Sequence, residues 1–265
     1  MKELKKLNNN ELKYLAESLL ETFLAAGNKS LELREKGLIT KIKSDNSPVT
    51  NGDIEVDRLL SEKIKKITPN IPLISEEMAN PKKSNICKNF WLVDPIDGTK
   101  DYINNSDEFT LNAALITNLE PSIGIIYAPA KKRLFYSFGK GFAFEKFENK
   151  KVILNCTKKT KIGEVHAVSN SSRPSEEILK IHKKFNVKSY INMRSSYKFC
   201  VIASGEFDLY AATARAYEWD IAAGHAIVKH SGGIVTTIDE KEFKYGKSDY
   251  KNLDLLVRRS QKLEK

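Results

Sequence analysis

The stretch Asp94-Pro95-Ile96-Asp97-Gly98-Thr99 constrains this chain more than any other. It follows Phe90–Val93, a short apolar run typical of a strand buried on both faces. Two carboxylates then lie three residues apart, beside a proline that restricts the backbone and a glycine that permits close approach. A strand that ends in this way offers oxygen ligands to a hard cation and free backbone N–H groups to a phosphate. The same residues are also compatible with an ordinary turn in which both aspartates only cap the backbone.

Length and cysteine usage favour a protein of the cytoplasm. The chain has 265 residues, enough for one large domain or two small fused ones, and 41% of them are hydrophobic. No apolar run approaches the roughly 18 residues that a spanning helix needs, and the first residues lack the apolar stretch of a signal peptide. Cys87, Cys156 and Cys200 are far apart and show no C-x-x-C spacing, which argues against a disulfide framework or a zinc site.

The formal net charge of +10 raises the alternative of a basic nucleic-acid-binding protein. The lysines, however, are scattered in pairs such as Lys65-Lys66 and Lys183-Lys184, without a dense run or interleaved aromatic residues. We therefore expect dispersed surface charge and no nucleic-acid partner. A basic field can still attract a small polyanionic substrate.

The N-terminal part predicts two helices. Apolar residues at helical spacing indicate a helix over 11–27, capped by Asn9 or Asn10 and ended by Gly27. A turn-rich stretch over 43–53 precedes a second helix that starts near Asp53 and stops at Pro69. On local evidence alone, capping explains Asp53.

Glu76 becomes a candidate ligand through its position. It follows Ile71–Ser75, a short apolar run that predicts a strand, and Asp94 follows the next predicted strand along the chain. If those two strands are neighbours, the two carboxylates converge.

The remaining segments predict an α/β protein with two halves. Alternating patterns and turns over 111–154 indicate strands joined by hairpins into an antiparallel sheet, so residues 1–155 form an α+β half. Strands and helices alternate in residues 156–265, which form an α/β half. In this half we expect strands over 165–169, 187–192, 207–211 and 254–259, a helix opened by Pro174 and a helix over 195–204.

Asp220 is predicted as the N-cap of an alanine-rich helix that ends at Gly232-Gly233, and capping is its simplest interpretation. Its neighbour Trp219 is most simply a core residue. His225 and His230 lie five residues apart, off the i, i+4 face that a pair of helical metal ligands would share, so neither resembles a ligand or a base.

Taken together, four blocks resemble the inositol monophosphatase-like superfamily of Mg²⁺-dependent, lithium-sensitive phosphatases. In chain order they are Pro48-Val49-Thr50 with Asp53, Ser75-Glu76-Glu77, Asp94 to Thr99, and Trp219-Asp220 with Gly232-Gly233. The blocks span almost the whole chain. The resemblance implies a layered αβαβα fold of the sugar-phosphatase type, with the site between the two halves.

Carried over residue by residue, the resemblance implies roles for particular groups. The metal ligands would be Glu76, Asp94, the Ile96 carbonyl, Asp97 and Asp220, holding two or three Mg²⁺ ions. Asp53, Glu76 and Thr99 would orient and deprotonate the attacking water. The backbone N–H groups of Gly98 and Thr99 would bind the scissile phosphate. Ser196, Lys198 and Lys43 are weaker candidates for gripping the substrate or a second phosphate, with surface charge as the alternative.

Within the superfamily, the chain is most similar to bacterial 3′(2′),5′-bisphosphate nucleotidases. The supporting residues include Lys100-Asp101 after the Gly-Thr pair and the block Ser196-Tyr197-Lys198-Phe199-Cys200. These proteins tend to carry Tyr-Pro-Arg before the Glu-Trp-Asp, whereas this chain has Tyr210-Ala211-Ala212, with Arg215 nearby. Arg215 is therefore a candidate replacement for the missing arginine.

The implied reaction is removal of the 3′-phosphate from adenosine 3′,5′-bisphosphate, which gives AMP and links the protein to sulfur assimilation. The sulfated analogue is a further candidate substrate. Alternatives are an inositol or sugar-phosphate phosphatase, the nucleic-acid-binding protein, and a catalytically silent metal-binding scaffold, against which the intact acids argue. We expect a monomer or homodimer that resides in the cytoplasm, with peripheral contact with the inner membrane as a second possibility.

Overall fold

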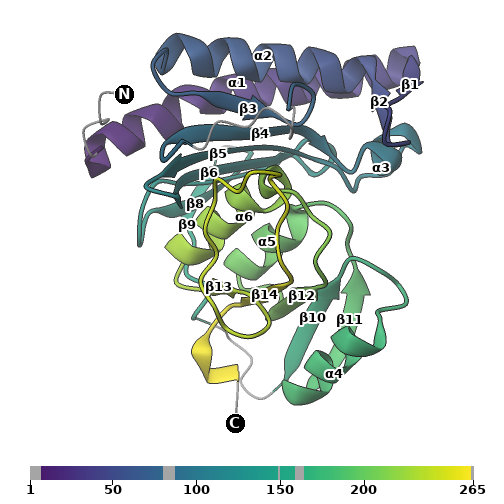
Figure 1. Ribbon diagram of the computed structural model, residues 1–265, viewed down its shortest axis with the longest axis vertical. Coiled ribbons are helices and arrows are strands. Elements are labelled where there is room, and N and C mark those ends of the chain that lie inside the picture. Colours follow the sequence, from purple (N-terminus) through teal and green to yellow (C-terminus); the bar gives the residue numbers. More distant parts are fainter. Residues whose placement is uncertain (1–6, 80–86, 149, 159–163, 264–265) are drawn as a thin grey trace.

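Alternating layers of helix and sheet, helix outermost on both sides, build the molecule seen in Figure 1. The computed structural model describes residues 7–79, 87–148, 150–158 and 164–263. The first layer is a pair of helices, α1 (Asn9–Lys36) and α2 (Asn51–Ile67), and beneath it lies a seven-stranded sheet. Helices α5 (Tyr197–Ala203) and α6 (Glu218–His230) separate this sheet from a five-stranded sheet, and α4 (Glu176–Lys184) covers the far side. This arrangement confirms the expected layered α/β class.

Helix α1 is longer than its sequence pattern predicts. It begins after Asn8, whose side chain and that of Glu11 form a capping box, so neither Asn9 nor Asn10 is the cap. It also continues through Gly27, which was expected to end it. A β-carbon at Gly27 would lie 2.2 Å from the Tyr127 ring, so this glycine permits close packing of α1 on the sheet rather than a stop.

The seven-stranded sheet follows the order of the chain. Its strands are β3 (Leu73–Ser75), β4 (Phe90–Asp97), β5 (Thr110–Thr117), β6 (Glu120–Ala128), β7 (Arg133–Ser137), β8 (Ala143–Phe147) and β9 (Lys150–Ile153). Strands β3 and β4 are parallel, and the others pair as antiparallel neighbours, which confirms the hairpins expected over 111–154. A small hairpin of β1 (Thr40–Ile42) and β2 (Pro48–Thr50) occupies the stretch expected to be turn-rich.

The second sheet has the order β11-β10-β12-β14-β13. Its strands are β10 (Val165–Ser169), β11 (Val187–Asn192), β12 (Leu209–Ala212), β13 (Ile234–Thr236), which the pattern did not predict, and β14 (Leu255–Arg258). Helix α4 starts at Glu176 with Ser175 as its cap, so Pro174 lies before the helix instead of opening it. The division of the chain after residue 155 stays a prediction.

Three apolar clusters lie between the layers. One packs α1 and α2 on a face of the large sheet, through side chains such as Trp91 and Val93. The opposite face, which carries Phe90 and Leu92, packs on α5 and α6, and this cluster also includes residues of the second sheet. The third cluster joins the second sheet to α4. Successive residues of β4 therefore point into different cores, as expected for a strand buried on both faces.

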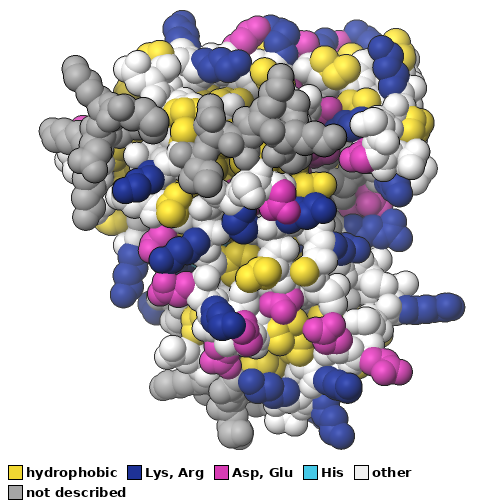
Figure 2. Space-filling model, in the orientation of Figure 1, with side chains coloured by type: hydrophobic (Ala, Val, Ile, Leu, Met, Phe, Trp, Pro, Cys, Tyr) yellow, Lys and Arg dark blue, Asp and Glu magenta, His cyan; other side chains and the backbone are white. Residues whose placement is uncertain are grey.

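The surface carries its charge in mixed form. On the face shown in Figure 2, lysine and arginine side chains alternate with aspartate and glutamate over all layers. Within the described residues, no helix combines the length and apolarity needed to cross a bilayer.

His230, at the C-terminal end of α6, is buried in a polar niche. Its Nδ1 accepts a hydrogen bond from the Gly139 N–H at 3.2 Å and lies 2.9 Å from the Ser137 hydroxyl. Burial and then the charge of Lys229 lower the pKa of His230 to about 4. The neutral ring is thus the form that the fold stabilises.

We expect His230 to make stability depend on pH. Because its folded pKa lies below the unfolded value of about 6.5, its contribution is present above pH 6.5 and is lost as pH falls towards 4. Between pH 7 and pH 5 the loss amounts to about 2 kcal/mol. Urea unfolding at both pH values should show a smaller drop in His230→Asn, which keeps an acceptor but does not titrate. An equal drop in both proteins would contradict this role.

Candidate active site

The carboxyl ends of β3 and β4 bring two of the predicted acids together. The strands are parallel neighbours with Ser75 opposite Val93, and the Glu76 N–H donates to the Val93 carbonyl at 3.0 Å. Glu76 and Asp94 are the next residues after this pair, so they lie at neighbouring positions on the two strands. The convergence that depended on neighbouring strands is present.

Asp94 is almost completely buried, with 1% of its surface exposed. It belongs to β4, which runs on to Asp97 with a register shift against β5, rather than to a turn that begins after Val93. Its Oδ1 atom is buried and has no hydrogen-bond partner among the described residues. Burial raises the pKa of Asp94 well above its usual value, and the charges of Glu76, Asp97 and Asp220 raise it further.

The next residues form a sharp corner into helix α3 (Thr99–Ile103). Gly98 adopts a left-handed conformation with φ +95°, and a β-carbon there would lie 2.7 Å from the Glu108 carbonyl oxygen. The Asp97 carboxylate accepts a hydrogen bond from the backbone N–H of Ser196. This contact ties the corner to the start of α5, in the other half of the chain.

Asp53 serves both as a cap and as a partner of Thr99. As the third residue of α2, it accepts hydrogen bonds from the Thr50 N–H at 2.8 Å and the Thr50 hydroxyl at 2.6 Å. Its other oxygen lies 3.1 Å from the Thr99 hydroxyl, which is equally close to the Ile96 carbonyl. Burial raises the pKa of Asp53 despite these hydrogen bonds.

Asp220 enters the cluster from helix α6. It was expected to be the N-cap, but Tyr217 holds that position and Asp220 is the third helical residue, whose carboxylate accepts from the Tyr217 N–H at 2.8 Å. Glu218 and Trp219 already have helical backbone, which displaces the cap by three residues. Burial, followed by the charges of Asp97 and Glu76, raises the pKa of Asp220 to about 8.

Lys43 neutralises part of this acidic cluster. Its ammonium lies 3.0 Å from Glu76 and 2.7 Å from Glu77, and the side chain is only 22% exposed. Burial opposes its charge, but the two carboxylates outweigh that effect and raise the pKa of Lys43. The predicted substrate contact of Lys43 is thus, in this structure, a contact with two acids.

The carboxylate oxygens of this cluster are the type of ligand that a hard divalent cation prefers. Over the described ranges, no group of three or more His, Cys, Asp or Glu side chains is arranged to hold a metal ion. Several acids are already engaged: Glu76 by Lys43, and Asp97 and Asp220 by backbone N–H groups. The unpaired Asp94 oxygen and the mutual repulsion of these carboxylates indicate a site that a cation would stabilise.

A pocket of about 570 Å³ opens beside Asp97 and Asp220. Basic side chains surround it: Lys100, Arg194, Lys198 and Arg215. Leu253 and Leu255 contribute an apolar wall, and Ser47 reaches it from the β1–β2 hairpin. The pocket is therefore suited to a ligand with negative charge and an apolar part.

Lys198 and Ser196 have different environments within this region. The Lys198 ammonium donates to the carbonyls of Arg194 at 2.8 Å and Ser195 at 2.7 Å, and the residue lines the pocket. Ser196 is buried, and its hydroxyl lies 2.7 Å from the Thr110 hydroxyl and 2.5 Å from the Asn112 side-chain oxygen. Ser196 thus positions Asp97 through its N–H, while Lys198 faces the pocket.

Sequence reasoning did not single out four of the residues at this site. Glu77 stood beside the chosen Glu76, but its contact with Lys43 depends on the β1–β2 hairpin. Lys100 supported the family resemblance without a role of its own, Arg194 carried no prediction, and Tyr210 was expected in a strand. Their place in the pocket depends on tertiary packing, for which a single sequence gives no signal.

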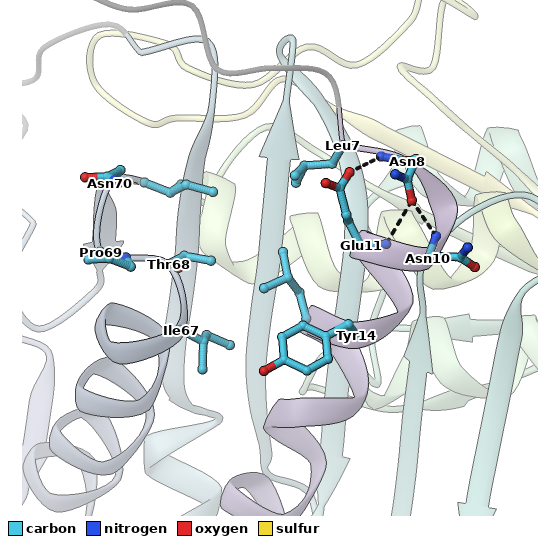
Figure 3. A pocket seen from close by; sticks show the side chains of 11 residues that line it. Leu7, Asn8, Asn10, Glu11, Tyr14, Ile67, Thr68, Pro69 and Asn70 are labelled. Carbon is cyan, nitrogen blue, oxygen red and sulfur yellow. Dashed lines mark hydrogen bonds between the residues drawn. The ribbon is translucent and has the colours of Figure 1, made fainter.

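A second pocket, shown in Figure 3, lies far from this chemistry, between the start of α1 and the end of α2. It measures about 510 Å³, and Glu11 is the one charged side chain among its described lining residues. That carboxylate accepts the Asn8 N–H at 2.7 Å as part of the helix cap. The pocket therefore offers no reactive group comparable to the acidic cluster.

Comparison with known proteins identifies the family. Residues 4–264 match the profile of the Inositol monophosphatase family. The chain belongs to this family. It is 34% identical over 238 residues to the 3′(2′),5′-bisphosphate nucleotidase CysQ of Buchnera aphidicola, covering 86% of each chain. The relative of the same name from Escherichia coli K12 is 33% identical over 77% of this chain and 81% of its own.

A solved structure agrees with these relatives. The crystal structure of CysQ from Bacteroides thetaiotaomicron, described as a bacterial member of the inositol monophosphatase family, superimposes with a TM-score of 0.74. It is 30% identical in sequence, and the match covers 96% of this chain and all of the other. The family assignment thus holds in both sequence and fold.

The Lys43 contacts predict a competition between its ammonium and a bound cation. Removing a positive charge 3.0 Å from Glu76 should strengthen Mg²⁺ binding, by about three- to tenfold at a partly exposed site. Calorimetric titration of Lys43→Met with Mg²⁺ measures this change. Lys41→Met, an exposed lysine of the same hairpin, is the matched control. Weaker binding by Lys43→Met would show that the lysine supports the site instead.

Proposed function

We propose that this protein is a Mg²⁺-dependent 3′(2′),5′-bisphosphate nucleotidase that hydrolyses adenosine 3′,5′-bisphosphate to AMP and phosphate. The single observation that carries this proposal is the junction of an acidic cluster with a basic pocket: Asp97 and Asp220 line the same cavity as Arg215 and Lys198. A substrate with two phosphates matches that combination, one phosphate at the acids with their metal and one at the basic side chains. The names of the relatives point to the same substrate class.

Glu76, Asp94, Asp97, Asp220 and the Ile96 carbonyl are the groups that would hold two or three Mg²⁺ ions. Oxygen-only donors favour Mg²⁺ over softer metals. When bound, such ions supply an activated water and stabilise charge on the leaving oxygen. The positive charge of these ions would also stabilise the ionised form of the buried acids.

Asp53 and Thr99 would handle the proton of the attacking water, a role that their mutual contact supports. The Thr99 hydroxyl donates a hydrogen bond to Asp53 or to the Ile96 carbonyl, each at 3.1 Å. In the first arrangement it would take the proton of the attacking water while its own proton passes to Asp53. Glu76, at the end of β3, is the second carboxylate available to orient that water. Backbone N–H groups at the Gly98–Thr99 corner would bind the scissile phosphate.

The second phosphate would lie among Lys198, Arg194, Lys100 and Arg215. Arg215 forms no hydrogen bond or ion pair with another described residue, so its guanidinium is available to a ligand. Ala212 lines the pocket at the position where Tyr-Pro-Arg sequences carry their arginine, and its small side chain leaves room. Arg215 would thus replace the missing arginine from three residues further along the chain.

Residence in the cytoplasm, the monomeric or dimeric state and contact with the inner membrane stay predictions. Activity on the sulfated analogue stays one as well.

The substrate assignment predicts a clear difference between two phosphatase assays. Phosphate release from adenosine 3′,5′-bisphosphate should exceed release from inositol 1-phosphate by at least about tenfold in kcat/KM, because only the bisphosphate engages the basic pocket. A chelator should abolish it, and so should Asp97→Ala. Preference for inositol 1-phosphate would favour the inositol phosphatase alternative. Salt-dependent oligonucleotide binding that survives Asp97→Ala would favour the nucleic-acid alternative.

Arg215→Ala should raise KM for adenosine 3′,5′-bisphosphate by about tenfold, because a charge-assisted hydrogen bond to phosphate is lost. Steady-state kinetics of Arg215→Ala and of the wild type measure this effect. Arg173→Ala, an exposed arginine outside the pocket lining, is the matched control. If Arg215→Ala and Arg173→Ala behave alike, the pocket does not use Arg215.

A further inference from the structure

Tyr210 is a buried tyrosine whose hydroxyl has no assigned purpose in the fold. The residue is 4% exposed, lies on β12 and lines the pocket together with Asp97 and Asp220. Its ring packs edge-on against Phe199, with centroids 5.8 Å apart, and the Lys198 ammonium lies 5.2 Å from the ring centre. The ring is thus held in one position from two sides.

No described residue forms a hydrogen bond with the Tyr210 hydroxyl. The hydroxyl is not among the fully buried polar atoms that lack a partner, so it opens onto the pocket and can donate to a ligand there. The hydroxyls of two other buried tyrosines have partners inside the fold: that of Tyr102 donates to the Ser30 carbonyl at 2.5 Å, and that of Tyr245 lies 3.0 Å from the His225 ring. Tyr210 differs from these two in lining a ligand pocket.

The surroundings of the hydroxyl indicate the charge of its missing partner. It lies within electrostatic reach of Arg215, Asp97 and Asp220, which line the same cavity. Burial and the two carboxylates raise its pKa against the opposing effect of Arg215, so the hydroxyl keeps its proton and can donate. Lys198 has one N–H left after its two carbonyl contacts. Three donors of this pocket, on Tyr210, Lys198 and Arg215, are therefore available to an anionic ligand.

We infer that the Tyr210 hydroxyl donates a hydrogen bond to the second anionic group of the substrate, the one that is not hydrolysed, and thereby selects for doubly charged substrates. This inference rests on the proposed function. The hydroxyl is a neutral donor fixed by its ring, so it adds direction to the attraction that Arg215 and Lys198 supply through charge. It binds substrate and does not take part in proton transfer.

Tyr210→Phe tests the inference because it removes only the hydroxyl. We expect KM for adenosine 3′,5′-bisphosphate to rise by roughly 10- to 100-fold, the range for a lost hydrogen bond to a charged group. The increase should be at least tenfold larger than for adenosine 3′-monophosphate, which lacks the second phosphate. The melting temperature should not fall, because the lost hydroxyl has no partner in the fold.

Tyr127→Phe is the matched control. Tyr127 is also 4% exposed and likewise has no hydrogen bond with a described residue, but it packs on Gly27 beneath α1, outside the pocket. A general effect of deleting a buried hydroxyl would appear in both variants. A specific role predicts an effect in Tyr210→Phe alone.

The outcomes separate this inference from the proposed function. If wild type hydrolyses the bisphosphate and Tyr210→Phe changes KM equally for both substrates, or for neither, the inference is overturned and the function stands. If wild type hydrolyses neither nucleotide, the proposed function fails. Calorimetric titration with adenosine 3′,5′-bisphosphate in the presence of a chelator then decides on Tyr210. Weaker binding by Tyr210→Phe than by Tyr127→Phe supports the contact, and equal binding overturns it.

Discussion

Repulsion among buried carboxylates is the constraint on which this structure depends. Asp94, Asp97 and Asp220 come from two halves of the chain into a region where burial raises the pKa of each. Backbone N–H groups and the lysines Lys43 and Lys198 offset part of this cost. The secondary structure is arranged accordingly: the end of β4 carries Asp94 and Asp97, and the first turn of α6 carries Asp220. Replacing these acids with apolar residues of similar size would increase the free energy of unfolding.

The parts of the site that are local in sequence were predictable. The run from Phe90 through Thr99 indicates a buried strand that leads into a sharp corner, and the structure contains both. The proximity of Glu76 to Asp94 followed from one condition, that successive strands are neighbours. The layered α/β fold was predictable because the apolar residues follow a helical spacing in some segments and a strand pattern in others, with turn residues between them. Gly27 was misleading, since a glycine that permits close packing and one that ends a helix look alike in sequence.

Other parts could not be read from a single sequence. Asp220 looks like a cap and is in fact the third residue of its helix, and only the packing of α6 on the large sheet brings it to Asp97. Lys43 and Glu77 meet because a hairpin folds back over the end of β3. The basic pocket gathers residues from five separate segments, none of which is unusual in composition. Such long-range placement depends on the complete set of contacts in the core.

One of the three cores has a wider consequence. It contains Phe90 and Leu92 from the first sheet, Phe199 and Ile227 from the helices between the sheets, and Val257 from the last strand. Neither half of the chain therefore has a complete interior without the other. Asp97 and Asp220 lie side by side on two elements that border this shared interior, β4 and α6, so a ligand that touches both links these elements directly. Its binding free energy adds to the cooperative stability of the entire fold and not to that of one loop.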